Sequence, residues 1–348
     1  MKAFQVTGFG GLDKLEYKTV ELPSLEKDEV LVKIHATALN NSDIWMREGG
    51  YGTDRSSDAA AGWRREGIQF PRIPGSDIAG EIVKVGSEVE DKVLHKKVVL
   101  FPFQSSGKVG HEHMSEDIAY IGSEFDGGYA EYVIWKADLC YDAPLTNLSE
   151  SAPIPVSGLT AWHMIKRANI QKGEMVLVNG ATGGVGSFAV QIAANVFGAK
   201  VIALVRDQSL DKKMKELGAY KTVAYKSHQL VEDITKASDG QIDVVLDVVG
   251  DAMFSTSLAV LKKGGTFVTS GASSGVLTEL DLRTLYLKHL NLLGSTLGTK
   301  EEFDDLLKAV QDGLVKPIID KTFPLEKAKE AQSYFKESKQ LGKVVLLP

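Results

Sequence analysis

Cysteine is almost absent from this chain, because its 348 residues include only Cys140. A single thiol cannot form a disulfide within the chain, and it cannot supply a metal site that needs several clustered cysteines. Stability must therefore come from packing, and a chain of this length buries most of its apolar surface. The length also exceeds that of a typical single domain, so two domains are expected.

An excess of positive charge and a long apolar run are also missing. The formal net charge is -6 at pH 7, and lysine and arginine are dispersed, which is not typical of nucleic-acid-binding proteins. No apolar run approaches the length of a membrane span, and the first residues contain no signal-peptide core. We therefore expect a cytoplasmic protein that binds neither nucleic acid nor a membrane.

A glycine-rich turn is the most informative motif in the sequence. The apolar run Val176–Val178 predicts a buried strand, and apolar residues from Val185 to Val196 recur at helical spacing as far as Gly198. The turn between them is a one-residue variant of the dinucleotide-binding fingerprint, made of Gly180, Ala181, Thr182, Gly183, Gly184, Val185 and Gly186. Glycines let a pyrophosphate approach the main chain at a helix N-terminus. We interpret the motif as a nucleotide site; the alternative is a tight strand-to-helix turn.

The two halves of the chain differ in pattern. Residues 1–150 contain short alternating segments typical of strands, at Val30–His35, Ile78–Gly86, Val98–Phe101 and Tyr129–Val133. Residues 151–295 alternate six strand candidates with five helix candidates, which predicts a doubly wound parallel sheet with its ligand at the carboxyl ends of the strands. The final residues predict an amphipathic helix around Phe303 and a last strand at Gly342–Leu346.

Several motifs, in order along the whole chain, resemble the medium-chain dehydrogenase/reductase superfamily, and specifically its zinc-lacking quinone oxidoreductase branch. They are Ala38–Asp43, Ile73–Asp77, Ala79–Val83, Gly127–Glu131, Gly158–Trp162, the glycine turn, Asp247–Gly250 and Gly294–Ser295. The resemblance implies an α/β protein with two domains. A GroES-like β-rich catalytic domain would comprise 1–150, completed by 296–348, and a Rossmann NAD(P)-binding domain would comprise 151–295. It also implies an active site in the cleft between them and a homodimer or homotetramer.

Departures from the zinc alcohol dehydrogenases of that superfamily argue against a catalytic metal. By the resemblance, the first metal cysteine falls at Asn40, the Gly-His-Glu segment at Gly75–Asp77 and the third ligand at Val156. Asparagine and valine cannot replace thiolates, so no zinc is expected. The loop Pro102–Tyr129 also lacks the four cysteines of the structural zinc lobe. Its His111-Glu-His113 segment suggests a metal site or, preferably, a solvated loop.

The end of the second strand of the Rossmann domain decides which nicotinamide cofactor is expected. Arg206 follows the strand where relatives that use NAD carry an acidic residue, and its guanidinium matches a 2′-phosphate. We therefore expect NADP(H) rather than NAD(H), although Arg206 could be solvated and Asp207 could serve NAD or cap the next helix. The resemblance adds further residues to the cofactor site: Asn41, Thr160, Tyr225, Val249, Ser270, Gly271, Ser295 and, beside the phosphate, Lys343.

The expected chemistry follows from the missing metal. Without a Lewis acid, oxidation of a simple alcohol loses its main driving element, whereas a quinone or an α,β-unsaturated carbonyl supplies its own electron sink. Asn40 is the preferred hydrogen-bond donor to the oxygen of this small electrophilic acceptor, with Ser42 and Tyr51 as weaker candidates. Asp43 is interpreted as an anchor of its turn. The alternatives are a zinc-dependent alcohol dehydrogenase and a non-catalytic, crystallin-like NADPH-binding protein.

Overall fold

The computed structural model describes residues 1–50, 68–206, 208–337 and 341–348. The chain forms two compact units. Unit 1 comprises Met1–Val156, Thr299–Leu307 and Pro317–Pro348, and unit 2 comprises Ser157–Gly298 and Lys308–Lys316. The domain boundaries proposed from the sequence, at 150 and 295, lie six and three residues from these, and Lys308–Lys316, expected in the GroES-like domain, belong to unit 2. No helix in the described ranges is long and apolar enough to cross a membrane.

Unit 1 is built on a seven-stranded sheet, as the alternating pattern of its sequence predicts. Its strands follow the order β16-β17-β3-β4-β5-β9, and β8 also pairs with β3. These strands are β3 (Glu29–Ala38), β4 (Asp77–Val85), β5 (Lys97–Leu100), β8 (Tyr132–Lys136), β9 (Cys140–Asp142), β16 (Ile319–Pro324) and β17 (Lys343–Leu347). Two small sheets pair β1 (Lys2–Val6) with β2 (Leu15–Thr19) and β6 (Phe103–Gln104) with β7 (Ala119–Tyr120).

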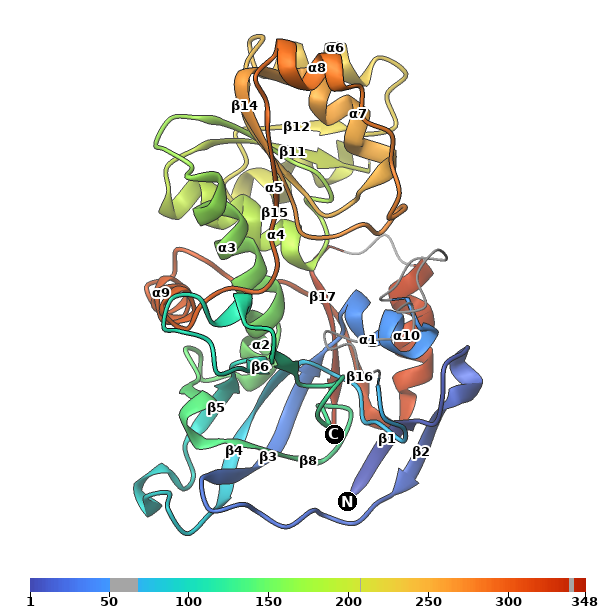
Figure 1. Cartoon of the computed structure of the whole chain (residues 1–348), viewed down its shortest axis with the longest axis vertical. Helices are drawn as coiled ribbons and strands as arrows, with labels where there is room; N and C mark the ends of the chain where they lie inside the picture. The colour runs from blue at the N-terminus through green and yellow to red at the C-terminus, as the bar shows by residue number, and fades with distance from the viewer. Residues whose placement is uncertain (51–67, 207, 338–340) are drawn as a thin grey trace. The chain divides into compact units, whose positions relative to one another are not determined.

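The last strand of the chain, β17, lies inside this sheet, between β16 and β3 (Figure 1). β17 pairs antiparallel with β3, where Val345 faces Ala38, and it pairs in parallel with β16. The helices of unit 1 include α1 (Asn41–Glu48), α2 (Leu148–Ser151) and α10 (Ala328–Glu337), while α9 (Lys300–Gln311) belongs partly to each unit. β17 therefore brings the final residues of the chain against residues that directly precede α1.

One local expectation for unit 1 is wrong. The strand expected from Tyr129 begins at Tyr132, because the backbone before it is hydrogen-bonded to other segments: the Tyr129 N–H donates to the Pro74 carbonyl. Further along the chain, α2 is capped by Asn147, whose side chain accepts the Ser149 N–H.

Unit 2 contains the predicted parallel sheet of six strands, in the order β12-β11-β10-β13-β14-β15 (Figure 1). The strands are β10 (Met175–Val178), β11 (Lys200–Val205), β12 (Lys221–Ala224), β13 (Ile242–Asp247), β14 (Leu261–Thr269) and β15 (Asn291–Gly294). Successive strands run outward from β10 in one direction and from β13 in the other, which is the doubly wound arrangement. Its helices are α3 (Leu159–Ala168), α4 (Gly184–Gln191), α5 (Asp211–Glu216), α6 (Leu230–Ala237), α7 (Asp251–Val260) and α8 (Leu282–Leu287).

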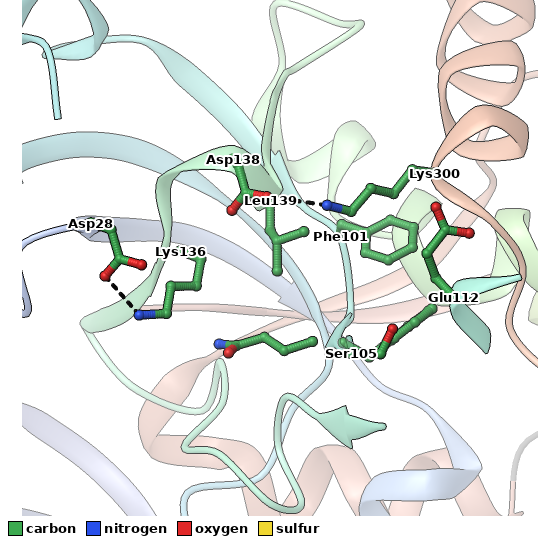
Figure 2. Close-up of a pocket in the computed structure, with 10 residues that line it drawn as sticks. Asp28, Phe101, Ser105, Glu112, Lys136, Asp138, Leu139 and Lys300 are labelled. Atoms are coloured by element: carbon green, nitrogen blue, oxygen red, sulfur yellow. Dashed lines mark hydrogen bonds and ion pairs between the residues drawn. The ribbon is translucent and has the colours of Figure 1, made fainter. Parts of the chain in front are cut away.

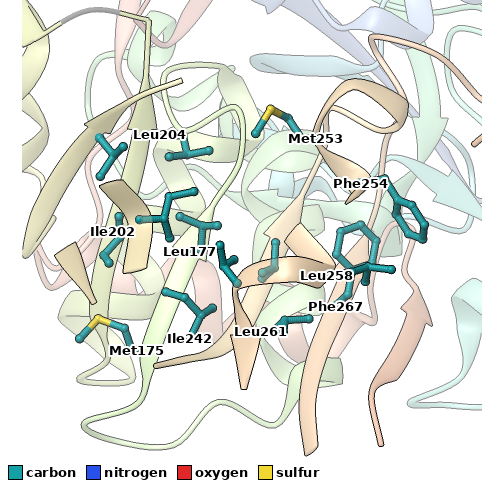
Figure 3. Close-up of a cluster of buried hydrophobic side chains, with 14 of the residues drawn as sticks. Met175, Leu177, Ile202, Leu204, Ile242, Met253, Phe254, Leu258, Leu261 and Phe267 are labelled. Carbon is teal, nitrogen blue, oxygen red and sulfur yellow. The ribbon is translucent and has the colours of Figure 1, made fainter. Parts of the chain in front are cut away.

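A cluster of buried apolar side chains holds one part of this sheet against its helices (Figure 3). Leu177 and Ile202 contribute from adjacent strands, and Phe254 of α7 packs edge-on against Phe267 of β14 at 5.3 Å. Burial of these residues fixes the strands, and with them the loops at their carboxyl ends.

Candidate active site

The cofactor residues expected in unit 2 gather at the carboxyl edge of the sheet. Val205 of β11 pairs with Ala224 of β12, so Arg206 and Tyr225, which follow them, lie at neighbouring strand ends. On the other side of β10, the Ser270 N–H donates to the Asp247 carbonyl at 3.0 Å, and the Ser295 N–H donates to the Thr269 carbonyl at 2.9 Å. Val249 and Gly271 belong to the same set of loops. This edge is where doubly wound sheets bind ligands.

The glycine turn has the geometry that a pyrophosphate site requires. Gly180 has a φ of +67°, and a Cβ on Gly186 would lie 2.1 Å from the Gly180 carbonyl oxygen. Only glycine fits there, because the start of α4 packs directly on the turn. The N-cap residue of α4 is Gly183, so no side chain caps the first N–H groups of the helix. These N–H groups can therefore donate hydrogen bonds to a bound anion.

A buried side chain directly before the turn, Asn179, forms contacts that the sequence did not predict. The Asn179 side chain donates to Asp247 Oδ1 at 2.8 Å and to Ser257 Oγ at 2.9 Å. Asp247 in turn accepts the Gly250 N–H at 2.9 Å, and burial raises the pKa of its carboxyl group. This arrangement links the loop after β10 to the loop after β13.

Ser295 offers a second observation that fits a bound nucleotide. Its Oγ is buried and has no hydrogen-bond partner among the residues that the structure describes. Thr160 is buried on α3, whereas Tyr225 is half-buried and packs against the apolar cluster. The roles of these residues toward a cofactor stay predictions, and Asp207 lies outside the described residues.

In unit 1, the carboxylate of Asp77 joins four segments of the chain. Its Oδ2 accepts the Lys343 ammonium at 2.8 Å and the Asn40 amide at 3.0 Å, and its Oδ1 accepts the Val156 N–H at 2.6 Å. Lys343 Nζ also donates to Asn40 Oδ1 at 2.5 Å. Asp77 is fully buried and Lys343 is 2% exposed. The two charges thus neutralise each other away from solvent, in what we call the Asp77 cluster: Asn40, Asp77, Val156 and Lys343.

This geometry does not favour the role expected for Asn40. Its amide oxygen is fixed by Lys343, and its Nδ2 is directed at Asp77 and, at 3.4 Å, at the Ala38 carbonyl. Both amide hydrogens therefore point at protein acceptors rather than at a substrate oxygen. The phosphate contact expected for Lys343 is not favoured either, because its ammonium is buried beside Asp77.

The first turn of α1 adjoins the cluster and carries Asn41, Ser42 and Asp43. Asn41 is exposed. The Ser42 Oγ is buried and has no hydrogen-bond partner in the described part of the chain. Asp43 accepts the Asn40 N–H at 2.9 Å and the Tyr129 hydroxyl at 3.3 Å, an arrangement that supports the expected anchor role. Burial raises the pKa of Asp43 to about 7. Tyr51, the remaining candidate, lies outside the described residues.

The His111-Glu-His113 segment differs from the expected solvated loop. His111 is exposed, but Glu112 is only 4% exposed. It begins a short 3-10 helix that packs closely on the loop before it, since a Cβ on Gly107 would lie 2.9 Å from the Glu112 Cα. Throughout the described ranges, no group of three His, Cys, Asp or Glu side chains is placed to hold a metal ion.

Comparison with known families agrees with both folds. Residues 26–145 match the alcohol dehydrogenase GroES-like domain, and residues 184–312 match the domain family called zinc-binding dehydrogenase. An NAD-dependent alcohol dehydrogenase of Sulfurisphaera tokodaii is 31% identical, with all of both chains covered. The chain belongs to the medium-chain dehydrogenase/reductase superfamily.

Other members of the medium-chain dehydrogenase/reductase superfamily show how far the similarity extends. The quinone oxidoreductase of Rattus norvegicus is 30% identical, covering all of this chain and 98% of its own. The cobalt- and zinc-bound thermostable alcohol dehydrogenase of Pyrobaculum aerophilum is 30% identical, with a TM-score of 0.87 over 100% of this chain and 99% of its own. Unit 1 is thus the GroES-like part and unit 2 the Rossmann part of an NAD(P)H-dependent oxidoreductase.

The zinc site of this superfamily can be tested against the residues present. A catalytic zinc needs three protein ligands, usually thiolate, imidazole or carboxylate. The positions matched to those ligands hold Asn40, Val156 and the Gly75–Asp77 segment, and the one carboxylate among them is paired with Lys343. An ammonium already supplies the positive charge there. The donor set therefore does not fit a zinc ion.

Proposed function

We propose that this protein is an NADPH-dependent, zinc-independent reductase of quinones or activated alkenes. The observation that carries the proposal is the Asp77 cluster, in which a buried Lys343–Asp77 ion pair stands where the superfamily's metal ligands align. The glycine turn and the carboxyl edge of the unit 2 sheet support nucleotide binding. The quinone oxidoreductase among the relatives supports this class of acceptor.

The acceptor class follows from the charge that develops during reduction. The nicotinamide, when bound, supplies a hydride, and reduction of a conjugated carbonyl then places negative charge on the acceptor oxygen. A hydrogen-bond donor stabilises that oxygen, and solvent can supply the proton that completes the reduction. The buried Ser42 hydroxyl, which lacks a partner within the described ranges, is the donor we propose in place of Asn40.

The preference for NADPH rests on Arg206. It is half-buried directly after β11, beside the end of β12, where Tyr225 follows. A guanidinium presents two parallel N–H donors to a phosphate, whereas a ribose hydroxyl would gain little from it. The relative named an NAD-dependent alcohol dehydrogenase makes NADH the competing cofactor.

The test is NADPH oxidation in metal-free buffer with a chelator, on a panel of one quinone, one enone and one alkenal. Turnover that the chelator does not affect would support the proposal. Cofactor binding without turnover would favour a non-catalytic, crystallin-like role. Stoichiometric zinc in the purified protein, together with alcohol oxidation that a chelator abolishes, would overturn the proposal in favour of a zinc alcohol dehydrogenase.

We also propose that the protein is cytoplasmic and forms a homodimer or homotetramer. β15 is an edge strand of the unit 2 sheet. The helix before it, α8, exposes Leu282, Tyr286 and Leu287, each at least 60% accessible. Clustered apolar side chains of this size usually mark an interaction surface.

A further inference from the structure

A pocket of about 240 Å³ lies in unit 1, at the loop that replaces the superfamily's structural zinc lobe (Figure 2). None of its residues belongs to the Asp77 cluster. Apolar side chains contribute to its wall, together with three carboxylates and two ammonium groups. The lining residues are Asp28, Phe101, Phe103, Gln104, Ser105, Glu112, Lys136, Asp138, Leu139 and Lys300.

Both ammonium groups of the pocket already have carboxylate partners. Lys136 lies 2.7 Å from Asp28 and 3.4 Å from Glu29, and Lys300 lies 3.1 Å from Asp138 (Figure 2). These pairs account for every carboxylate of the lining except that of Glu112.

Glu112 is different, because it is buried and no partner for it is found in the described chain. Neither carboxylate oxygen accepts a hydrogen bond from the described residues, and Glu112 forms no ion pair with them. Burial of a carboxylate without a partner is costly, so such a group usually signals a bound cation or proton. Glu112 therefore marks this pocket as a candidate binding site.

The surroundings favour a positively charged ligand. The lining carries three carboxylates against two ammonium groups, so an excess of negative charge is left at Glu112. In the same direction, burial first and then the charges of Asp304, Asp138 and Glu112 raise the pKa of the nearby Tyr141. A metal ion would need more ligands than the described residues bring together. An organic cation carries its own N–H donors and needs only acceptors, which Glu112, Gln104 and Ser105 can supply.

We propose that this pocket binds a small organic cation, a primary ammonium or a guanidinium, that pairs with Glu112. The volume suits a molecule of a few heavy atoms beyond the charged group. The paired carboxylates at Asp28 and Asp138 remain with their lysines, and the ligand neutralises the one charge left uncompensated. The site is independent of the reductase chemistry, and it requires neither NADPH nor an acceptor.

The experiment is calorimetric titration of the full chain with methylguanidinium and with n-propylammonium, at millimolar concentrations and constant ionic strength. We expect saturable binding to the wild-type protein and binding at least about tenfold weaker to Glu112→Gln, since a charged hydrogen bond is lost. Glu90→Gln, an exposed carboxylate outside the pocket, serves as the matched control and should bind like the wild type. Tetramethylammonium, a cation without N–H donors, should not bind.

Three results would overturn the proposal: no saturable binding to the wild type, equal binding to Glu112→Gln, or equal binding of tetramethylammonium. If Glu112→Gln fails to fold, Ser105→Phe tests the same site, because it fills the pocket and leaves Glu112 in place. A basic side chain of a second copy of this chain is the alternative occupant of the pocket. Sedimentation of both variants tests for it, because loss of that contact would dissociate an oligomer. Dissociation of an oligomer on Glu112→Gln, without cation binding to the wild type, would assign the pocket to that contact.

Discussion

The ammonium of Lys343 lies 2.8 Å from the Oδ2 of Asp77, although 266 residues separate them in the chain. Both side chains are excluded from solvent, and Lys343 is the cation paired with Asp77 in the described structure. Removal of either partner would leave a charge buried without compensation. A buried ion pair of this kind costs more to break than to replace as a whole.

Lys343→Met should therefore destabilise the protein by about 3–5 kcal/mol in urea-induced unfolding, because the buried Asp77 carboxylate loses its counter-charge. The double variant Lys343→Met/Asp77→Asn should recover part of this loss, since neither charge remains. Lys27→Met removes an exposed ion pair with Glu88 and should change stability little. Equal effects of Lys343→Met and Lys27→Met would contradict a structural role for the pair.

Asp43 predicts a pH dependence of stability. Its pKa in the folded protein is raised to about 7 by burial. The folded state then binds a proton more tightly than the unfolded state, so the contribution of Asp43 to stability falls as pH rises from about 4 to about 7. Relative to Asp43→Asn, the wild type should lose roughly 2–4 kcal/mol across this range and nothing further above about pH 8.

Urea unfolding of both proteins at one-unit pH intervals measures this difference. Asp117→Asn is the control, because hydrogen bonds from Ser115 and Ser106 lower the pKa of Asp117 to about 2. In the folded protein Asp117 titrates below the range tested, and in the unfolded chain near its ordinary value of 3.8. It should therefore add only a small rise in stability between pH 4 and about 5, opposite in sign to the Asp43 trend. A flat difference between wild type and Asp43→Asn would mean that the Asp43 carboxyl titrates normally.

Arg206→Ala should weaken NADPH much more than NADH, by roughly tenfold or more, because a charge-assisted contact to the 2′-phosphate disappears. Dissociation constants from nicotinamide fluorescence give the comparison directly. Lys212→Ala, an exposed cation on α5, should leave both constants unchanged. An equal loss of affinity for NADPH and NADH would show that Arg206 does not bind the 2′-phosphate.

Ser42→Ala should lower kcat/KM for the acceptor by roughly 10- to 100-fold if its hydroxyl stabilises the developing oxyanion. NADPH affinity should stay at the wild-type value, and Ser42→Thr, which keeps a hydroxyl, should recover part of the activity. Steady-state kinetics with the best acceptor of the panel gives these numbers. Full activity of Ser42→Ala would require another donor.

The exposed face of α8 should hold the proposed oligomer together. Leu282→Glu/Leu287→Glu should produce a smaller species in sedimentation velocity, because charges replace two side chains that are 64% and 62% exposed. Val109→Glu, at an 89% exposed apolar position in unit 1, provides the control and should not change the sedimentation coefficient. An unchanged oligomer in the α8 variant would place the interface elsewhere.

Local patterns were sufficient to predict the Rossmann part. Its strands are continuous apolar runs between glycine-rich turns, so the six strands, their parallel order and the residues at their carboxyl ends followed from periodicity and chain order. The glycine turn was readable because Gly180 and Gly186 meet within seven residues. The resemblance to a family added most of the remaining candidates.

Contacts between residues far apart in the sequence could not be predicted from local patterns. The residues around Lys343 and Asp77 in the sequence do not indicate that the two form an ion pair. The expected roles of Asn40 and Lys343 stay predictions, which the contacts of this pair do not favour. Burial of Glu112 was missed for a similar reason, since its neighbours His111 and His113 are polar and the packing that covers it depends on tertiary structure.

The position of β17 also constrains how the protein can mature during synthesis. This strand completes the unit 1 sheet beside β3 and carries Lys343, yet it follows all of unit 2 along the chain. A ribosome therefore releases the segments of unit 2 before it releases the strand that unit 1 needs. Unit 2 can fold while translation continues. Asp77, in contrast, has no counter-charge until β17 leaves the ribosome. The incomplete GroES-like part is therefore accessible to chaperones for longer than unit 2.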